Sequence, residues 1–442
     1  MSAPPASDAG APLTLAEFPR ALIHFDGDAF FTSVEQALHP ELQGRPLVTG
    51  QERGIIACAS YEAKALGIKR GVPLWEARRR CPQLVVLPSD YETYSLYSQR
   101  MFAIARQFSP LVEEYSIDEG FADLTGMRRL QRCAYREIAR RFQTAVREQL
   151  GLTVSVGLSL SKSLAKLASK YRKPRGLTAV AGRHIHLFLA RTPLETVWGF
   201  GPNTVALLQR HGLRTALDYI RRPEDWAARL LGKVGRETWR ELRGESVWPL
   251  QDQPQPPKTS ISKCHSFPGP IREREGVYAK LVRNIESAFI KLRRHHLQTQ
   301  ALAIALRRQD FEEQALEARL NRPAATAQEA LPLVRILFDR LYQPDTPYRA
   351  TLAVLLELSP DRALQYDLFT DPLRLNQVRE AGAALDHVNR AYGKHALAAG
   401  HTLFLREQPT GERTQLPWRK RELARGETAR QRLHLPRWDL RV

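Results

Sequence analysis

A proline- and glutamine-rich segment, residues 251–257, most constrains what this chain can fold into. It contains three prolines and no apolar face, and a proline inside a helix removes a backbone hydrogen bond. We therefore predict an extended interdomain linker over residues 249–257. A chain of 442 residues is expected to form about three domains, and this linker marks one of their boundaries.

The pattern before the linker mixes strands with helices. Two short strands are expected to meet at an acidic turn that contains Asp118 and Glu119. The other expected elements are strands at 21–25, 47–49, 54–59 and 152–160 and helices at 61–66, 91–108 and 133–150. Together they predict an α/β or α+β body, preceded by a flexible leader over residues 1–19.

The chain changes character twice more. Residues 191–248 read as short helices separated by glycines, which predicts a small all-helical domain. Residues 258–360 predict a small α+β module of two helices, 277–292 and 327–342, and two strands, 301–306 and 351–358. Residues 361–442 are irregular and end in a run of arginines, which predicts a poorly ordered tail.

Charge and cysteine usage narrow the class of protein. Lys and Arg number 66 against 47 Asp and Glu, which gives a net charge of +19. Such an excess favours a polyanionic partner, because each phosphate neutralised by a cation releases counterions. Four dispersed cysteines predict neither a disulfide framework nor a zinc site. No apolar stretch is long enough for a membrane span, so a cytoplasmic location is expected.

Three carboxylates lie at predicted strand ends: Asp26, Asp118 and Glu119. Burying them is costly unless a cation neutralises them, and hard divalent ions such as Mg²⁺ bind oxygen ligands of this kind. Two such ions could bridge all three and support in-line displacement at phosphorus. Taken singly, each residue is more often a solvated turn or a helix N-cap, so both interpretations stay open at this point.

Four motifs resemble, in the same order, the signature blocks of Y-family translesion DNA polymerases. They are residues 25–31, 60–67, 115–121 and 156–159. The resemblance extends from about residue 21 to 369. Residues 112–119 and 197–201 are most similar to the UmuC branch, the catalytic subunit of DNA polymerase V, and the DinB branch, DNA polymerase IV, comes next.

The resemblance implies a multidomain α+β fold, a right-hand polymerase with palm, fingers, helical thumb and an α+β little-finger domain. The implied domains are a palm over 20–30 and 96–190, fingers over 31–95, a thumb with a helix-hairpin-helix over 191–248, a little finger over 258–360 and a tail over 361–442.

The resemblance also implies a catalytic centre. Asp26, Asp118 and Glu119 would be metal ligands for two Mg²⁺ ions, with Mn²⁺ able to substitute, and the main-chain carbonyl of Gly27 would be a further ligand. Gly27 stands where the family usually has a bulkier residue. Phe31 matches the steric gate, an aromatic ring that would clash with a ribose 2′-hydroxyl.

Further residues are implied to bind substrates. The dNTP site would consist of Phe30, Phe31, Tyr61, Lys64 and Lys173. Lys64 replaces the family's usual arginine and provides a point charge without a bidentate fork. DNA would be held by Gly199 and Gly201 through backbone amides, and by Arg283, Arg293, Arg294 and Arg307 of the little finger.

A short motif after the last predicted strand, Gln365, Asp367, Leu368 and Phe369, is similar to sliding-clamp docking peptides. The implied function is addition of dNTPs to a primer 3′-hydroxyl on damaged template DNA during the SOS response, with a UmuD-type partner and a recombinase filament as further partners. The alternatives are a catalytically inactive clamp-bound repair scaffold and a structural or RNA-binding basic protein. The presence of all three carboxylates favours the polymerase.

Overall fold

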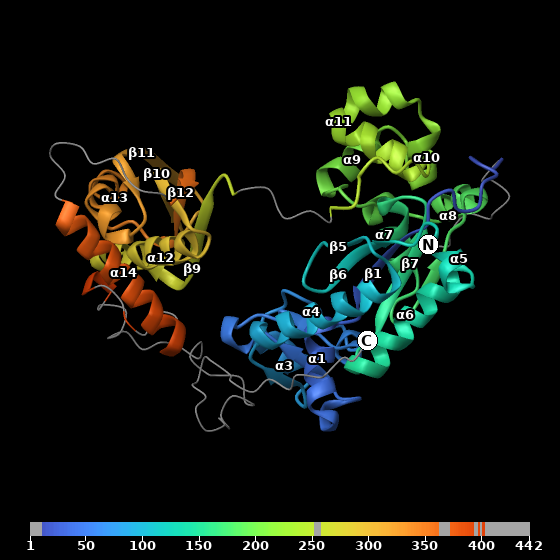
Figure 1. Ribbon diagram of the computed structural model, residues 1–442, viewed down its shortest axis with the longest axis horizontal. Coiled ribbons are helices and arrows are strands. Elements are labelled where there is room, and N and C mark those ends of the chain that lie inside the picture. Colours follow the sequence, from blue (N-terminus) through green and yellow to red (C-terminus); the bar gives the residue numbers. More distant parts are fainter. Residues whose placement is uncertain (1–10, 252–257, 362–371, 393–396, 398–399, 403–442) are drawn as a thin grey trace. The chain divides into compact units, whose positions relative to one another are not determined.

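The chain forms two compact units, residues 1–253 and 254–442, and the boundary lies inside the predicted linker. The computed structural model describes residues 11–251, 258–361, 372–392, 397 and 400–402. Figure 1 shows the helices and strands of both units.

A five-stranded sheet forms the centre of the first unit. Strand β1 (Leu22–Gly27) lies in the middle and pairs antiparallel with both β6 and β7. The order across the sheet is β5 (Val112–Glu114), β6 (Glu119–Asp123), β1, β7 (Val154–Ser159) and β8 (Leu177–Ala179). Since β1 is bonded on both edges, residues at its end are held by two neighbouring strands.

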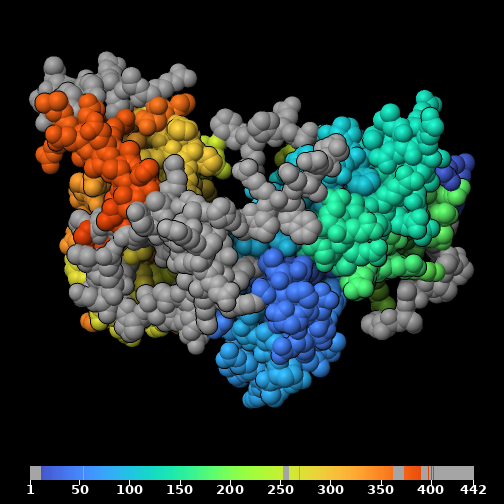
Figure 2. All heavy atoms as spheres, turned by 60° about the horizontal axis from the view of Figure 1, so that its bottom comes forward, coloured from blue at the N-terminus to red at the C-terminus, as the bar shows by residue number. Residues whose placement is uncertain are grey.

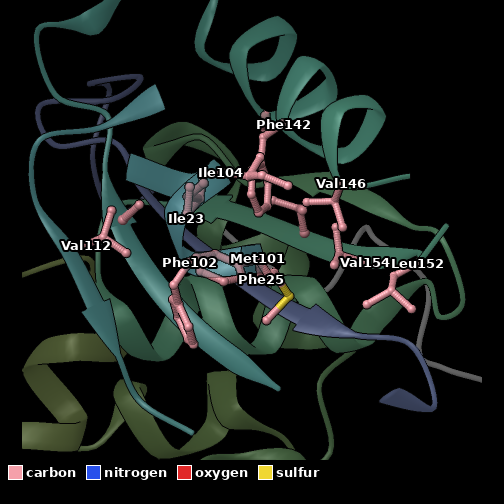
Figure 3. Packing of buried hydrophobic residues seen from close by; sticks show 14 of the residues in the cluster. Ile23, Phe25, Met101, Phe102, Ile104, Val112, Phe142, Val146, Leu152 and Val154 are labelled. Atoms are coloured by element: carbon pink, nitrogen blue, oxygen red, sulfur yellow. The ribbon is translucent and has the colours of Figure 1, made fainter. Parts of the chain in front are cut away.

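Helices cover both faces of this sheet. On one face, Phe25 of β1 packs against Phe102 of α4 (Tyr91–Phe108) and Phe142 of α6 (Tyr135–Leu150), with ring centroids 5.5 and 5.0 Å apart (Figure 3). A Cβ on Gly120 of β6 would lie 2.5 Å from the Phe102 ring, so only glycine permits this close approach.

The other face of the sheet is covered by α7 (Lys162–Tyr171), which packs on β1 and β7. Successive side chains of a strand point to opposite faces. Because Phe25 faces α4 and α6, its neighbours His24 and Asp26 face the α7 side. The Nδ1 atom of His24 indeed lies 2.7 Å from the Ser169 hydroxyl of α7.

A small lobe, residues 30–87, contains a three-stranded sheet and three helices, and it projects from the first unit in Figure 2. The expected strand over 54–59 is wrong in its first half: only Cys58–Ala59 is a strand. Gly54 instead ends a 3₁₀ turn with φ of 67°. The lobe's elements are α1 (Phe30–Leu38), η2 (Pro40–Leu42), β2 (Leu47–Thr49), η3 (Gln51–Arg53), β3 (Cys58–Ala59), α2 (Tyr61–Ala65), α3 (Leu74–Arg80) and β4 (Val85–Leu87).

The rest of the first unit is helical. Helix α11 (Glu224–Leu242) bends at Gly232, whose φ is 68°. The other helices are α5 (Met127–Gln131), η4 (Gly182–His184), α8 (Ile185–Ala190), η5 (Leu194–Thr196), α9 (Pro202–Arg210) and α10 (Ala216–Arg221). Residues 191–248 are therefore helical, as predicted.

The predicted flexible leader is wrong for residues 11–19. Leu13 and Phe18 pack against the cores of the first unit, and the backbone carbonyl of Glu17 accepts a hydrogen bond from Gly182 at 2.8 Å. Two prolines disfavour a regular helix or strand in this segment, but contacts with distant residues order it.

The second unit contains a four-stranded antiparallel sheet of order β11-β10-β12-β9. Helices α12 (Arg274–Arg294) and α13 (Ala327–Leu341) pack on one face, against Leu302, Ile304 and Leu306. The strands are β9 (Ile261–Ile271), β10 (Leu297–Arg308), β11 (Glu313–Ala324) and β12 (Tyr348–Pro360).

The prediction of two strands in this module is therefore wrong. Strand β9 contains Pro268, Gly269 and Pro270, which are unfavourable in sheets. Strand β11 is an edge strand whose core-facing residues Leu316, Ala318 and Leu320 are only partly buried, and the sequence interpretation missed their alternation with polar residues. Both β9 and β11 are edge strands. Each is stabilised by pairing with a central strand, β9 with β12 and β11 with β10.

Part of the predicted poorly ordered tail is helical. Helix α14 (Pro372–Tyr392) is followed by η6 (Gly400–Thr402). Asp386 of α14 forms two hydrogen bonds with Arg293 of α12, at 2.6 and 2.8 Å, and Leu375 is buried. These contacts with the preceding module explain why a weakly patterned segment is ordered. The predicted clamp motif, residues 365–369, lies outside the described residues.

Candidate active site

Asp26 and Asp118 are brought together by the central sheet. Asp26 lies opposite Glu119 in the β1–β6 register, and the Gly27 N–H donates to the Asp118 carbonyl at 2.7 Å. Asp26, Gly27 and Asp118 all line one cavity of about 420 Å³. Two of the three predicted carboxylates therefore share a single site although they are distant in sequence.

Two carboxylates lie close together in the cavity. Burial raises the pKa of Asp118, and the nearby Asp26 and Glu119 carboxylates raise it further, although the Ser116 hydroxyl donates to Asp118 at 2.9 Å. Lys173 supplies the cation nearest to Asp26, with Nζ 2.5 Å from Oδ1. Carboxylates that destabilise each other's charge in this way form a favourable site for a cation.

The third predicted carboxylate, Glu119, contacts one lysine and one histidine of the protein. Lys166 Nζ lies 2.8 Å from both carboxylate oxygens, and His24 Nε2 lies 3.2 Å from Oε2. Burial by itself would raise the pKa of Glu119, but the hydrogen bonds from His24 and Lys166 outweigh it and lower the pKa to about 2. Burial lowers the pKa of His24.

No three His, Cys, Asp or Glu side chains of the described ranges are arranged as a ready metal-binding group. In the structure, Glu119 is adjacent to the cavity but its carboxylate is occupied by Lys166. Sequence reasoning missed both Lys166 and His24. The alternation of β1 does place His24 on the same face as Asp26, whereas no local pattern marks Lys166.

The predicted nucleotide-binding residues line the same cavity. Phe31 stacks on Tyr94 with ring centroids 4.4 Å apart, and Lys64 Nζ lies 4.3 Å from the centre of the Tyr61 ring. The predicted residues among the cavity's lining are Phe30, Phe31, Tyr61, Lys64 and Lys173. Arg70 lines the cavity as well, and the sequence interpretation did not include it. The only sequence feature that could have indicated Arg70 is the basic pair Lys69-Arg70, which follows α2.

The predicted DNA-binding glycines lie at the start of α9. Gly199 has a φ of 91°, and Gly201 is the N-cap of α9 with Pro202 as the first helical residue. A single 3₁₀ turn, η5, precedes them. A Cβ at either glycine would meet no atom within 4 Å, so both are open to an approaching ligand.

The four predicted DNA-binding arginines do not form one surface. Arg283, Arg293 and Arg294 belong to α12, on the helical side of the second unit's sheet. Arg307 follows the inward-facing Leu306 of β10 and so points to the opposite face. Arg307 pairs with Glu313 at 2.6 Å, and Arg293 pairs with Asp386. Intramolecular carboxylates thus occupy two of the predicted phosphate contacts.

Comparisons with known proteins identify the family of this chain. Residues 25–170 match the impB/mucB/samB family, and residues 258–368 match the impB/mucB/samB family C-terminal domain. The DNA polymerase IV of Opitutus terrae is 32% identical over 396 residues, which cover 88% of this chain and 98% of that protein. The DNA polymerase IV of Bacteroides fragilis is 34% identical over 320 residues, which cover 72% of this chain and 85% of that protein.

Solved structures are similar in fold. A Y-family DNA polymerase chimera aligns with a TM-score of 0.66 at 22% identity, covering 77% of this chain and 99% of the chimera. The insertion ternary complex of Dbh DNA polymerase aligns with a TM-score of 0.52 and the same identity and coverage.

The chain therefore belongs to the Y family of DNA polymerases, a class of DNA-directed DNA polymerases. Its fold is the multidomain right-hand polymerase fold of mixed α+β content with a C-terminal little-finger domain. The prediction that placed the UmuC branch first is not supported, because these relatives are DNA polymerases IV, the DinB branch. In the described part of the chain, no helix is both long and apolar enough to cross a membrane.

Proposed function

We propose that this protein adds dNTPs to a primer 3′-hydroxyl under the direction of a template, and that it copies damaged template DNA with low fidelity. The observation that carries this proposal is one cavity lined both by two clustered carboxylates, Asp26 and Asp118, and by Phe31, Tyr61 and Lys64. Acidic groups, cations and aromatic rings in a single cavity suit a nucleoside triphosphate and its reacting phosphorus.

The acidic residues of the cavity fit divalent metal ions. Their donors are carboxylate oxygens, the ligands that Mg²⁺ prefers, and burial together with repulsion from the neighbouring carboxylates raises the pKa of Asp118. Asp26, Asp118, Glu119 and the Gly27 carbonyl would hold two Mg²⁺ ions, with Mn²⁺ as a substitute. Such ions activate the attacking hydroxyl and neutralise charge on the leaving group. Glu119 would have to exchange its Lys166 contact for this role.

The cationic and aromatic residues of the same cavity would bind and select the nucleotide. Lys64 and Lys173 would neutralise the triphosphate, and the Tyr61 ring would contact it. Phe31, held against Tyr94 by stacking, would exclude a ribose 2′-hydroxyl. The family supports the proposed bypass of damaged bases, and the small side chains of Ala57 and Ala59 in the cavity lining would leave room for a distorted base pair.

A primer-extension assay tests the proposal. Wild-type protein should extend a primer with Mg²⁺ or Mn²⁺, on undamaged template and across a defined lesion. Asp118→Asn should abolish extension but keep salt-sensitive DNA binding, while Asp225→Asn, at the exposed start of α11, should behave like wild type. Extension by Asp118→Asn at the wild-type rate would contradict the assigned role.

The same assay tests the partners. We propose that residues 365–369 dock on a sliding clamp, so clamp addition should increase the length of extension products, and a Leu368→Ala, Phe369→Ala double variant should lose that gain only. The UmuD-type partner and the recombinase filament depended on the UmuC resemblance, and the proposal is not extended to them.

A further inference from the structure

We propose that Asp28 is a positioning residue that holds the nucleotide-binding side chains of Tyr61 and Lys173 in place. The inference rests on the proposed function of the cavity. Asp28 follows β1 by one residue and is 1% exposed, so it is buried beneath the cavity and is not among its lining residues. A buried carboxylate is costly unless it is well bonded, and the identity of its partners indicates what it does.

Three donors from three separate segments converge on the Asp28 carboxylate. Oδ1 accepts from the Ser155 hydroxyl of β7 at 2.7 Å and from the Tyr61 hydroxyl of α2 at 3.4 Å. Oδ2 accepts from the backbone N–H of Arg175 at 2.8 Å. All three donors are neutral, so Asp28 acts as a hydrogen-bonding hub that connects the sheet, the small lobe and the loop after α7.

The bond to Arg175 fixes the loop that carries Lys173. Arg175 has a φ of 61°, a left-handed conformation that is unfavourable for a non-glycine residue. The bond from its N–H to Asp28 offsets that cost. One residue later, the Gly176 carbonyl accepts from Val156 N at 2.8 Å. A Cβ on Gly176 would lie 1.6 Å from the Arg172 carbonyl oxygen, so the loop is tightly closed.

Lys173 lies within this closed loop and reaches Asp26. Since its backbone is restrained at Arg175 and Gly176, its ammonium group is directed into the cavity. Tyr61 is held in a similar way from the opposite side. Burial raises the pKa of Tyr61, with the negative charges of Asp28 and Asp26 adding to the effect, so the hydroxyl stays protonated and donates to Asp28.

The arrangement predicts how a neutral substitute would fail. Asp28→Asn replaces one acceptor oxygen by an NH₂ group, so it cannot accept from all three donors. The single amide oxygen can keep at most two of the three donors, so with that oxygen in the Oδ1 position the loop loses its bond from Arg175, and nucleotide binding should weaken. Loss of one charge-assisted hydrogen bond corresponds to about a tenfold change in an equilibrium constant. We expect Asp28→Asn to raise the KM for dNTP about tenfold, with a smaller change in kcat.

A double-mutant cycle separates positioning from a general structural role. Asp28→Asn, Lys173→Ala and the double variant are compared in single-nucleotide insertion and in equilibrium binding of a dNTP to the protein–DNA complex. If Asp28 acts largely through Lys173, its substitution should change dNTP affinity less than about twofold when Lys173 is already absent. Full tenfold effects in both backgrounds would overturn the proposal.

Ser33→Ala is the matched control, because the Ser33 hydroxyl bonds the backbone carbonyl of Asp28 at 2.6 Å and leaves the carboxylate contacts intact. It should not change the KM, and a tenfold rise would also contradict the proposal. Tyr61→Phe, which removes only the hydroxyl contact, should raise the KM by a smaller factor even if Asp28→Asn folds poorly. Equilibrium binding of the dNTP tests the role of Asp28 independently of catalysis. A wild-type protein that binds dNTP but does not extend a primer would refute the proposed function and leave the role of Asp28 open to the binding test.

Discussion

Substituting Lys162 by methionine should destabilise the first unit by about 3 to 5 kcal/mol, because it leaves a buried charge without its partner. Lys162 Nζ lies 2.8 and 2.6 Å from the two oxygens of Glu113, and the side chains are 5% and 8% exposed. Glu113 would keep only the backbone N–H of Gln251, at 2.9 Å. The pair thus connects β5, α7 and the end of the first unit.

The assay is thermal and urea unfolding. For a unit of this size, a loss of about 3 kcal/mol lowers the Tm by roughly 6 to 12 °C. The matched control is Lys233→Met. The Lys233 side chain is 78% exposed and its Nζ lies 3.6 Å from Glu237, so the change in the free energy of unfolding should stay below about 1 kcal/mol.

A second substitution tests the mechanism of this loss. Glu113→Gln added to Lys162→Met removes the stranded charge, while the amide oxygen still accepts from Gln251. The double variant should therefore be more stable than Lys162→Met alone. Equal changes in Tm for Lys162→Met and Lys233→Met would refute the reasoning. So would a double variant whose loss of stability equals the sum of the losses in the Lys162→Met and Glu113→Gln single variants.

Four further predictions concern the site and the second unit. Glu119 has a folded-state pKa of about 2 against its usual 4.5. Its contribution to stability should therefore be present above pH 4.5 and be lost as the pH falls toward 2. In Glu119→Gln, the urea midpoint of unfolding should depend less on pH over this range. Arg293→Ala breaks the pair with Asp386 and should lower the Tm of the second unit, whereas a smaller salt dependence of DNA affinity would instead indicate a phosphate contact. Phe31→Ala should increase ribonucleotide insertion in a single-nucleotide assay, and unchanged sugar selection would contradict the gate. Arg70→Ala should raise the KM for dNTP several-fold with primer–template affinity unchanged, and weaker DNA affinity at constant KM would reassign Arg70 to the template.

Local patterns were sufficient where an element's own apolar residues define it. The strand at 47–49 and the helix at 91–108 have the predicted bounds, because their apolar residues recur with the period of the structure they form. The acidic turn between two strands is also confirmed. Edge strands β9 and β11 and the packed segment 11–19 were missed, since partners distant in sequence provide most of their stabilisation.

By itself, the sequence determined which residues could perform chemistry: the acidic motifs, the cations and aromatic rings of the nucleotide site, and their order along the chain. Only the tertiary structure decided which of them meet. It placed Asp26 and Asp118 in one cavity and paired Glu119 with Lys166 and Arg293 with Asp386. It also buried Asp28 where three donors form hydrogen bonds with its carboxylate. The physical reason is that periodicity reports which face of an element is apolar, whereas the partner of a polar side chain depends on which distant segment packs against that face.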